Sequence, residues 1–449
     1  MSPSEGRDPS PGANSAPESR PAPALPERPT FREACRLWLK IGCLSFGGPA
    51  GQIALMHEEL VERRRWVDER RFQHALHFCI LLPGPEAQQL ATYLGWWLHG
   101  TRGALVAGTL FVLPAALLLL ALSWGYAVWG SLPAVTAVLR GVQPAVVALI
   151  VVALIRLGQR WLRHWGLGMM ALGAGWGLHS GLPFPALLLL VFGVGLLWPV
   201  ILPTAQSPES NAESSRPAPS DILRSPHWGR SVGVLWLCLA LWWLPVALAA
   251  LGLGGGHVLV REGIFFSGAS VLTFGGAYAV LPYVAQQAVE HFQWVSGPEM
   301  MAGMALAETT PGPLILVLQF VGFLGAWHHP GPLSPGVAGA LGAGMTSWTT
   351  FFPSFVWILV GAPWVERLQG WRQWERWVGV VSAGVVGMIL HLAWTLAHDT
   401  LRDAGGHWDG PGLGVLIASI ALLRWARWPS LAVVMLAGAL GLLRWGWGG

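Results

Sequence analysis

Long apolar stretches alternate with short polar connections along most of the chain. The stretches are continuous, as in helices that cross lipid, and lack the alternation over roughly 10 residues that marks strands of a membrane barrel. Several are shorter than the roughly 20 residues of a straight span. We therefore expect an all-α polytopic membrane protein with about 13 transmembrane helices. The candidate helices cover residues 37–56, 75–98, 104–128, 134–155, 165–181, 183–201, 232–252, 262–285, 300–326, 335–361, 377–397, 411–424 and 428–447.

Two polar segments divide the chain. Residues 1–30 are rich in Pro, Ser, Glu and Ala and hold no apolar stretch, so they indicate a disordered N-terminal tail and not a signal peptide. Residues 202–228 have the same character and predict a flexible linker. The expected domains are a first repeat, 31–201, and a second repeat, 229–449, with one extra leading helix.

An internal repeat at a constant offset of 228 residues is the clearest organisational feature. Chance would give about two identities over 41 positions, and the sequence has ten. Seven predicted helices separate the two starts, so we expect oppositely oriented halves, a common plan in secondary transporters. The identical pairs are Phe46/Phe274, Gly47/Gly275, Gly48/Gly276, Val61/Val289, Glu62/Glu290, Trp66/Trp294, Val67/Val295, Pro83/Pro311, Gly84/Gly312 and Pro85/Pro313.

The arginine distribution supports an N-terminus on the inner side of the membrane. Most arginines then fall in loops on that side, as the positive-inside rule requires. Arg102, Arg156, Arg160 and Arg163 are among them. Loop 57–74 is the exception, since it is placed outside although it holds five arginines and five acidic residues. Either segment 37–56 is re-entrant, or this loop has a role other than setting topology.

Composition narrows the class of protein. Hydrophobic residues make up 53% and charged residues 11% of the 449 positions, far below the charge that covers a soluble domain. A formal charge of +4, spread over short loops, offers no dense basic tract for nucleic acid. The four cysteines form no CxxC motif and no metal-ligand spacing, so we expect no metal and no cofactor.

Each repeat carries two elements that should interrupt a helix. Paired glycines let backbone amides turn toward a ligand, and a Pro-Gly-Pro run cannot stay helical in lipid. Duplicated breaks favour a binding site, and the alternatives are close helix packing and a simple kink. The elements are Ser45, Phe46, Gly47 and Gly48 with Pro83, Gly84 and Pro85 in the first repeat, and Thr273, Phe274, Gly275 and Gly276 with Pro311, Gly312 and Pro313 in the second.

Ionisable and polar groups flank the Pro-Gly-Pro runs. Glu86 follows the first, with Gln88 and Gln89 beside it, and Glu308 precedes the second, next to Thr309 and Thr310. A carboxylate at mid-span costs roughly 2.5–3.5 kcal/mol, which favours a function. Both glutamates are candidate proton carriers, and the alternative is a structural hydrogen-bonded acid.

Positive charge for an anion site is scarce in the second half, because no Lys or Arg occurs from Glu262 through Glu366. The positive field must come from backbone dipoles or from the first half. Arg63, Arg64 and Arg65 in loop 57–74 are the candidates, and the alternative is a solvated interfacial charge belt.

Several long motifs resemble the chromate ion transporter family. They are SFGGPA (45–50), QIA with Gln52, VERRRWV (61–67), LLPGPEAQQLA (81–91), LTFGGAYAVLP (272–282) and AETTPGPL (307–314), and the resemblance covers about 31 to 445. It implies a two-domain bacterial inner-membrane protein that exports chromate, driven by membrane potential or proton gradient, and confers chromate resistance. It also implies that the two PheGlyGly elements, the two Pro-Gly-Pro breaks, the flanking acids and glutamines, and the arginine loop carry the function.

Other functions stay open at this point. The substrate could be sulfate or another small oxyanion, since sulfate is a tetrahedral dianion that should compete with chromate. A chromate-reducing enzyme needs a redox centre, and the sequence holds no CxxC, no GxGxxG fingerprint and no haem-type histidine pair. A structural scaffold is disfavoured by the mid-membrane acids. No GxxxxGK[ST] motif indicates ATP-driven transport, and a homodimer is compatible with the sequence.

Overall fold

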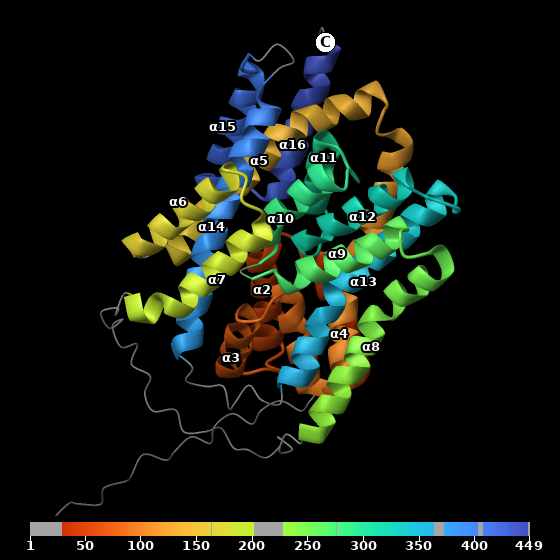
Figure 1. Ribbon diagram of the computed structural model, residues 1–449, viewed down its shortest axis with the longest axis vertical. Coiled ribbons are helices and arrows are strands. Elements are labelled where there is room, and N and C mark those ends of the chain that lie inside the picture. Colours follow the sequence, from red (N-terminus) through yellow and green to blue (C-terminus); the bar gives the residue numbers. More distant parts are fainter. Residues whose placement is uncertain are drawn as a thin grey trace, which may run out of the picture.

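The structure is a computed structural model that describes residues 29–162, 164–201, 228–274, 276–362, 372–402 and 407–447. Within them the chain is helical, with one isolated bridge between Arg402 and Trp408, so the predicted all-α class is confirmed (Figure 1). The helices are α1 (Phe31–Leu44), α2 (Gly48–His57), α3 (Glu69–Ile80), α4 (Glu86–Trp129), α5 (Pro133–Trp161), α6 (Trp165–His179), α7 (Phe184–Ile201), α8 (Trp228–Leu253), α9 (Val258–Val271), α10 (Ala277–Gln286), α11 (Gly297–Thr309), α12 (Val317–His328), α13 (Pro335–Gly361), α14 (Arg372–Thr400), α15 (Gly410–Arg424) and α16 (Ser430–Gly446).

Four of these helices are long and apolar enough to cross a membrane: Glu86–Trp129, Pro133–Trp161, Ser231–Leu253 and Gly379–Thr400. Shorter apolar helices accompany them, so the protein belongs in a membrane. The count of 13 spans stays a prediction. The predicted tail and linker lie almost wholly outside the described residues.

Four predicted segments are each two helices and not one. Segment 37–56 is interrupted between α1 and α2, 75–98 between α3 and α4, 262–285 between α9 and α10, and 300–326 between α11 and α12. Glycines with positive φ cause the turns, such as Gly47 at 87° and Gly84 at 126°. The predicted helix breaks are therefore confirmed, and the continuous spans drawn through them were wrong.

The same order of elements occurs twice at a shift of 228 residues. Helices α1, α2 and α3 correspond to α9, α10 and α11 within one or two residues. A π-helical turn follows α2 (η1, Glu58–Arg63), and another follows α10 (η2, Gln287–His291). The residues after these turns, Arg65 and Gln293, both have a φ of 54°. The repeat read from the sequence thus also describes the backbone path.

A sharp turn folds α4 into a hairpin. His99 and Gly100 leave helical geometry, with φ 64° at Gly100, and the chain reverses direction. Gly95 and Gly103 then face each other so closely that a side chain on either would overlap the other's carbonyl oxygen. The part of α4 before the turn has about 13 residues and a length of about 20 Å, which makes it a half-helix.

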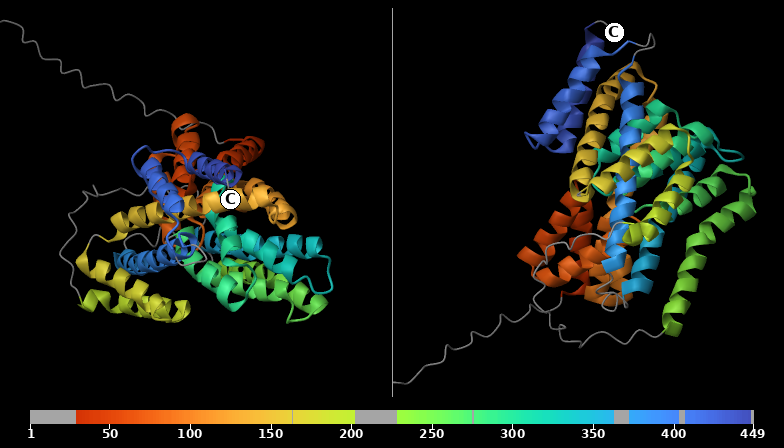
Figure 2. Two further views of the ribbon diagram at one scale, coloured as in Figure 1. Left: turned by 90° about the horizontal axis from the view of Figure 1, so that it is seen from above. Right: turned by 60° about the vertical axis from the view of Figure 1, so that its left-hand side comes forward.

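Figure 2 shows how the parts are arranged. The first helices, drawn in red, lie at one end of the molecule, and the α15–α16 pair, drawn in dark blue, lies toward the other. Helix α5 packs against α14, α15 and α16, while α14 also packs against α6 and α7. Helices α5 and α14 therefore lie at the centre of these contacts. Helices that flank the breaks pack against them, α10 against α14 and α11 against α5.

Candidate functional site

The helix breaks of the two repeats bond to each other. The amide of Gly84 donates to the carbonyl oxygen of Thr273 over 2.7 Å, and the amide of Gly312 donates to that of Ser45 over 2.7 Å. Gly84 is the repeat equivalent of Gly312, and Ser45 of Thr273, so the two bonds are reciprocal. Each Pro-Gly-Pro break therefore satisfies backbone groups of the opposite repeat's Gly-Gly break.

The place where the Pro-Gly-Pro breaks bond to the Gly-Gly breaks is called the crossing below. A cavity of about 1000 Å³, called the central cavity, opens beside it. It is lined by the N-terminal ends of three helices. Gly47 and Gly48 come from the start of α2, Glu86 from the start of α4, and Gly276 from the start of α10. Helix N-termini present free amides and a partial positive charge, so together they favour an anion.

Two arginines supply full positive charge to the central cavity. Arg156 and Arg160 lie one turn apart near the end of α5, and both are exposed in the cavity lining. A smaller hollow of about 360 Å³ adjoins it, shares Arg156 and adds Arg424 and Arg427. This concentration of like charge raises the local concentration of anions near the cavity.

The carboxyl groups of Glu86 and Glu308 also line the central cavity. The Tyr278 hydroxyl donates to Oε1 of Glu308 over 2.6 Å, joining α10 to α11. Oε1 of Glu86 lies 3.7 Å from the position that a Cβ on Gly276 would occupy. Arg160 is near enough to attract Glu86 electrostatically, and Arg156 to attract Glu308. Each of these two acids is thus within the electrostatic reach of an arginine of α5.

His57 and two acids close one side of the central cavity. Nδ1 of His57 lies 3.2 Å from Glu62, and Nε2 lies 2.5 Å from Glu69. All three residues line the cavity. The central cavity is therefore lined by acids as well as by the arginines of α5.

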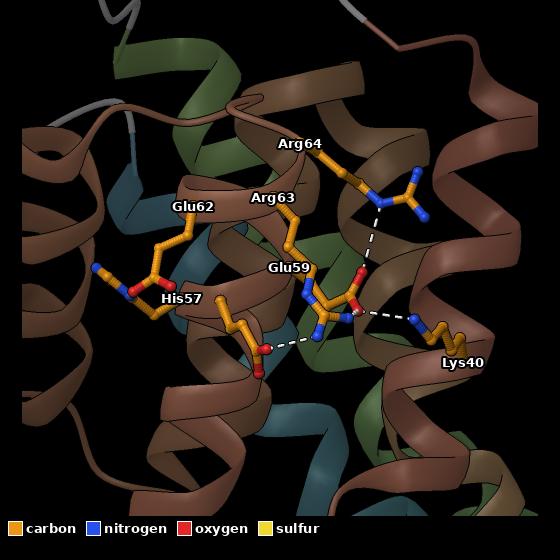
Figure 3. A network of polar contacts seen from close by, with 7 residues as sticks. Lys40, His57, Glu59, Glu62, Arg63 and Arg64 are labelled. Atoms are coloured by element: carbon orange, nitrogen blue, oxygen red, sulfur yellow. Dashed lines mark hydrogen bonds and ion pairs between the residues drawn. The ribbon is translucent and has the colours of Figure 1, made fainter.

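The three consecutive arginines of loop 57–74 lie outside the lining of the central cavity. Glu59 is buried, with 3% of its side chain exposed, and its carboxylate binds Lys40 over 2.7 Å, Arg63 over 2.9 Å and Arg64 over 3.5 Å (Figure 3). The hydrogen bond from Lys40 is the largest of the contacts that hold the pKa of Glu59 below its usual range. Neither Arg63, Arg64 nor Arg65 lines the central cavity, so their predicted role in binding substrate stays a prediction.

The glutamines are buried in the protein beside the breaks. Gln52 donates to the Ser45 carbonyl, Gln88 to that of Phe351 and Gln89 to that of Pro83. Each has a buried amide oxygen without a hydrogen-bond partner. Gln52 and Gln89 thus bond to backbone of the breaks, Gln88 bonds to α13, and none of the three lines the central cavity.

The remaining predicted residues are packed around the crossing. The hydroxyls of Ser45, Thr273, Thr309 and Thr310 donate to carbonyl oxygens of their own helices. Phe274 packs edge-on against Phe192, and Phe46 is 42% exposed. Gly275 lies outside the described residues. Pro83, Pro85, Pro311 and Pro313 flank Gly84 and Gly312 in the breaks and, like them, do not line the central cavity.

Sequence reasoning missed Arg156, Arg160 and Tyr278 as site residues. The two arginines were placed in a loop, because the apolar segment was ended at residue 155. Helix α5 continues to Trp161, and four-residue spacing then puts both side chains on one face. That spacing was the available signal.

Comparison with known proteins identifies the family. The profile described as "Chromate transporter" matches this chain twice, over residues 32–198 and 260–442. The chain belongs to the chromate transporter family. It is 31% identical over 429 residues to the chromate transport protein of Pseudomonas aeruginosa, covering 93% of each chain. It is 27% identical over 425 residues to the probable chromate transport protein of Synechococcus elongatus, covering 93% of this chain and 96% of the relative.

A third relative extends the range. The chromate transport protein of Cupriavidus metallidurans is 26% identical over 437 residues, which cover 95% of this chain and 97% of the relative. No solved structure matches the chain. Family membership indicates a membrane transporter and not an enzyme, and the two profile matches are themselves 228 residues apart at their starts.

Proposed function

We propose that this protein exports chromate across the bacterial inner membrane, driven by the membrane potential or the proton gradient, and thereby confers chromate resistance. One observation carries the proposal. Arg156 and Arg160 share a cavity with helix N-termini from both repeats. Two guanidinium groups beside several free amides suit a small tetrahedral dianion.

Energetics favours export. A dianion that leaves a cell with a negative interior gains about 4.6 kcal/mol per 100 mV, twice the value for a single charge. Uptake against that potential would require several coupled cations. Glu86 and Glu308 line the same cavity and are the candidates for carrying a coupled proton.

We further propose that the two repeats lie in opposite orientations in the membrane. The reciprocal bonds between Gly84 and Thr273, and between Gly312 and Ser45, support a two-fold relation between them. Discontinuous helices that cross near the middle are typical of transporters with inverted repeats.

Everted membrane vesicles test the function. Radiolabelled chromate should accumulate when a potential, positive inside, is imposed, and an uncoupler should abolish the uptake. Excess sulfate should lower chromate uptake if both dianions share the cavity. Uptake of labelled sulfate without any uptake of chromate would assign the site to another oxyanion. Uptake no greater than in vesicles without the protein would contradict both substrates.

A further inference from the structure

The second repeat holds a cavity of its own. It has a volume of about 110 Å³ and is called the second cavity below. Its lining comes from α10, η2, the start of α11 and the last three turns of α14, with Leu178 of α6 and Phe184 of α7 against it. The central cavity is about nine times larger.

The linings of the two cavities correspond position by position. At the offset of 228, the central cavity's Ala54, His57, Glu62, Glu69 and Phe72 become Pro282, Ala285, Glu290, Gly297 and Met300, and all of these line the second cavity. Such agreement at five positions shows that the second cavity occupies the equivalent place in the other repeat.

The lining residues of the long helices α5 and α14 also correspond between the two cavities. Helices α5 and α14 both have 29 residues, and their ends are 239 positions apart. At that offset Val152, Ala153, Arg156, Leu157 and Arg160 become His391, Leu392, Thr395, Leu396 and Asp399. These five residues again line the second cavity. The agreement is thus found on two independent walls.

One short helix, α10, lies between the two cavities. Tyr278 of α10 lines the central cavity, and Pro282, one turn later, lines the second, so about 6 Å of helix separates them. Helix α11 also lines both, with Glu308 on one side and Met300 on the other. The hydrogen bond from Tyr278 to Glu308 ties these helices together at the partition.

The first repeat has no such tie at the same place. Ala50 and Ile80 stand where the second repeat has Tyr278 and Glu308, and neither side chain can form a hydrogen bond. The repeat with the tie has the small cavity, and the repeat without it has the large one.

We propose that the second cavity is the closed form of the release route for the transported dianion, and that the Tyr278–Glu308 hydrogen bond is the gate of this route. This rests on the proposed function. When the gate opens, the second repeat adopts the open arrangement of the first, and the central cavity closes in exchange. The anion then leaves past Thr395 and Asp399. These two residues are the equivalents of Arg156 and Arg160, which line the central cavity. Loss of two positive charges weakens its binding and favours release.

Thiol labelling tests this without any substrate. Cys35, Cys43, Cys79 and Cys238 are replaced, and single cysteines are introduced as Gln73→Cys in the central cavity or Thr395→Cys in the second. Trp394→Cys is the matched control, because Trp394 is the neighbour of Thr395 and is 61% exposed outside both cavities. A membrane-impermeant maleimide is then added to one face at a time. Equal amounts of each single-cysteine protein in the membrane, and an unchanged elution volume in detergent, confirm that it folds.

The expected result is labelling of Gln73→Cys from one face and of Thr395→Cys, at least tenfold more slowly, from the other. Adding Tyr278→Phe should speed labelling of Thr395→Cys about fivefold, slow that of Gln73→Cys, and leave Trp394→Cys unchanged. Labelling of both cavity positions from the same face, or rates that Tyr278→Phe does not alter, would overturn the proposal. Because the assay needs no chromate, a wrong substrate would leave the labelling pattern intact, whereas a wrong route would alter labelling while chromate uptake persists.

Discussion

The two π-helical turns follow the same backbone path and are stabilised by different chemistry. After η1, Arg65 has a φ of 54°, and after η2, Gln293 has the same value. The first turn is held by the buried carboxylate of Glu59 with its three cations. The second is held by aromatic rings, with Phe292 stacked on Trp294 at a centroid distance of 4.3 Å.

The contrast shows which features of the repeat are constrained. Glycine, proline and close helix packing set the backbone in both halves, because positive φ and interrupted helices leave few alternatives. Side chains that only support this backbone can then differ in charge. Side chains in the cavities differ too: Arg156 and Arg160 line the central cavity, and Thr395 and Asp399 stand at the equivalent positions of the second cavity.

The largest expected effect comes from removing that asymmetry. In the double variant Arg156→Gln, Arg160→Gln, the KM for chromate should rise about 100-fold, because each charge-assisted hydrogen bond contributes about 1.5 kcal/mol even at the low end of its range. Initial uptake rates in everted vesicles over a range of chromate concentrations measure it.

Arg140→Gln is the control on the same helix, since Arg140 is exposed and lines neither cavity. Equal KM values for the double variant and this control would show that α5 does not hold the anion. Immunoblots of the vesicles check that both proteins reach the membrane in equal amounts.

Glu86 and Glu308 in the central cavity should give a smaller effect. Glu86→Gln and Glu308→Gln are expected to remain in the membrane and to lower chromate uptake about tenfold. Tyr278→Phe removes one hydrogen bond of about 1 kcal/mol and should cost no more than about fivefold. If an acid carries a coupled proton, its glutamine variant should lose uptake driven by a pH gradient and keep part of the uptake driven by potential. A wild-type rate under both gradients would remove that acid from the mechanism.

The sequence was sufficient to predict the helical class, the repeat and all four helix breaks. Each depends on local signals, such as the Gly-Gly pairs and the Pro-Gly-Pro runs, that act within a few residues. The same signals placed Glu86 and Glu308 beside the breaks, and both line the central cavity.

The sequence could not show which cations meet those acids. Arg63 lies in a loop rich in acids and Arg156 directly follows an apolar segment, and neither pattern shows which arginine reaches the acids at the breaks. The difference arises only in the folded protein: Glu59, within η1, binds Arg63, whereas the end of α5 brings Arg156 to a cavity that residues of the opposite repeat also line. The equivalence of the two cavities was hidden for the same reason, because α5 and α14 share a length but no motif.

Glu59→Gln tests the ionic turn and should destabilise the protein by about 1–2 kcal/mol. Glu59 is buried, but its three partners are 40–58% exposed, so solvent screens part of the attraction. Thermal unfolding in detergent measures the change. Gln287→Glu places a carboxylate at the equivalent position of η2, where the sequence offers no lysine or arginine between Glu262 and Glu366, and it should also destabilise. An unchanged Tm for Glu59→Gln would show that the cations stabilise the turn without it.

The same pair has a pH signature. Because Lys40 and the arginines lower the pKa of Glu59 in the folded protein, its contribution to stability is complete above the unfolded value of about 4.5 and is lost as the pH falls through the folded pKa. The difference in Tm between wild type and Glu59→Gln should therefore be largest near pH 7 and shrink as the pH falls below about 4. A difference that grows on acidification would contradict the ion pairs.

The smallest effect should come from the aromatic turn, and salt distinguishes it from the ionic one. Phe292→Leu removes the ring stacked on Trp294 and should cost about 1 kcal/mol, in the range of aromatic pairs. Salt at 1 M shortens the screening length to about 3 Å, so the destabilisation caused by Glu59→Gln should decrease. The destabilisation caused by Phe292→Leu should stay the same, because apolar contacts are not screened. Equal salt dependence of the two variants would mean that both turns rely on charge, and the contrast between the repeats would then lie in the cavities alone.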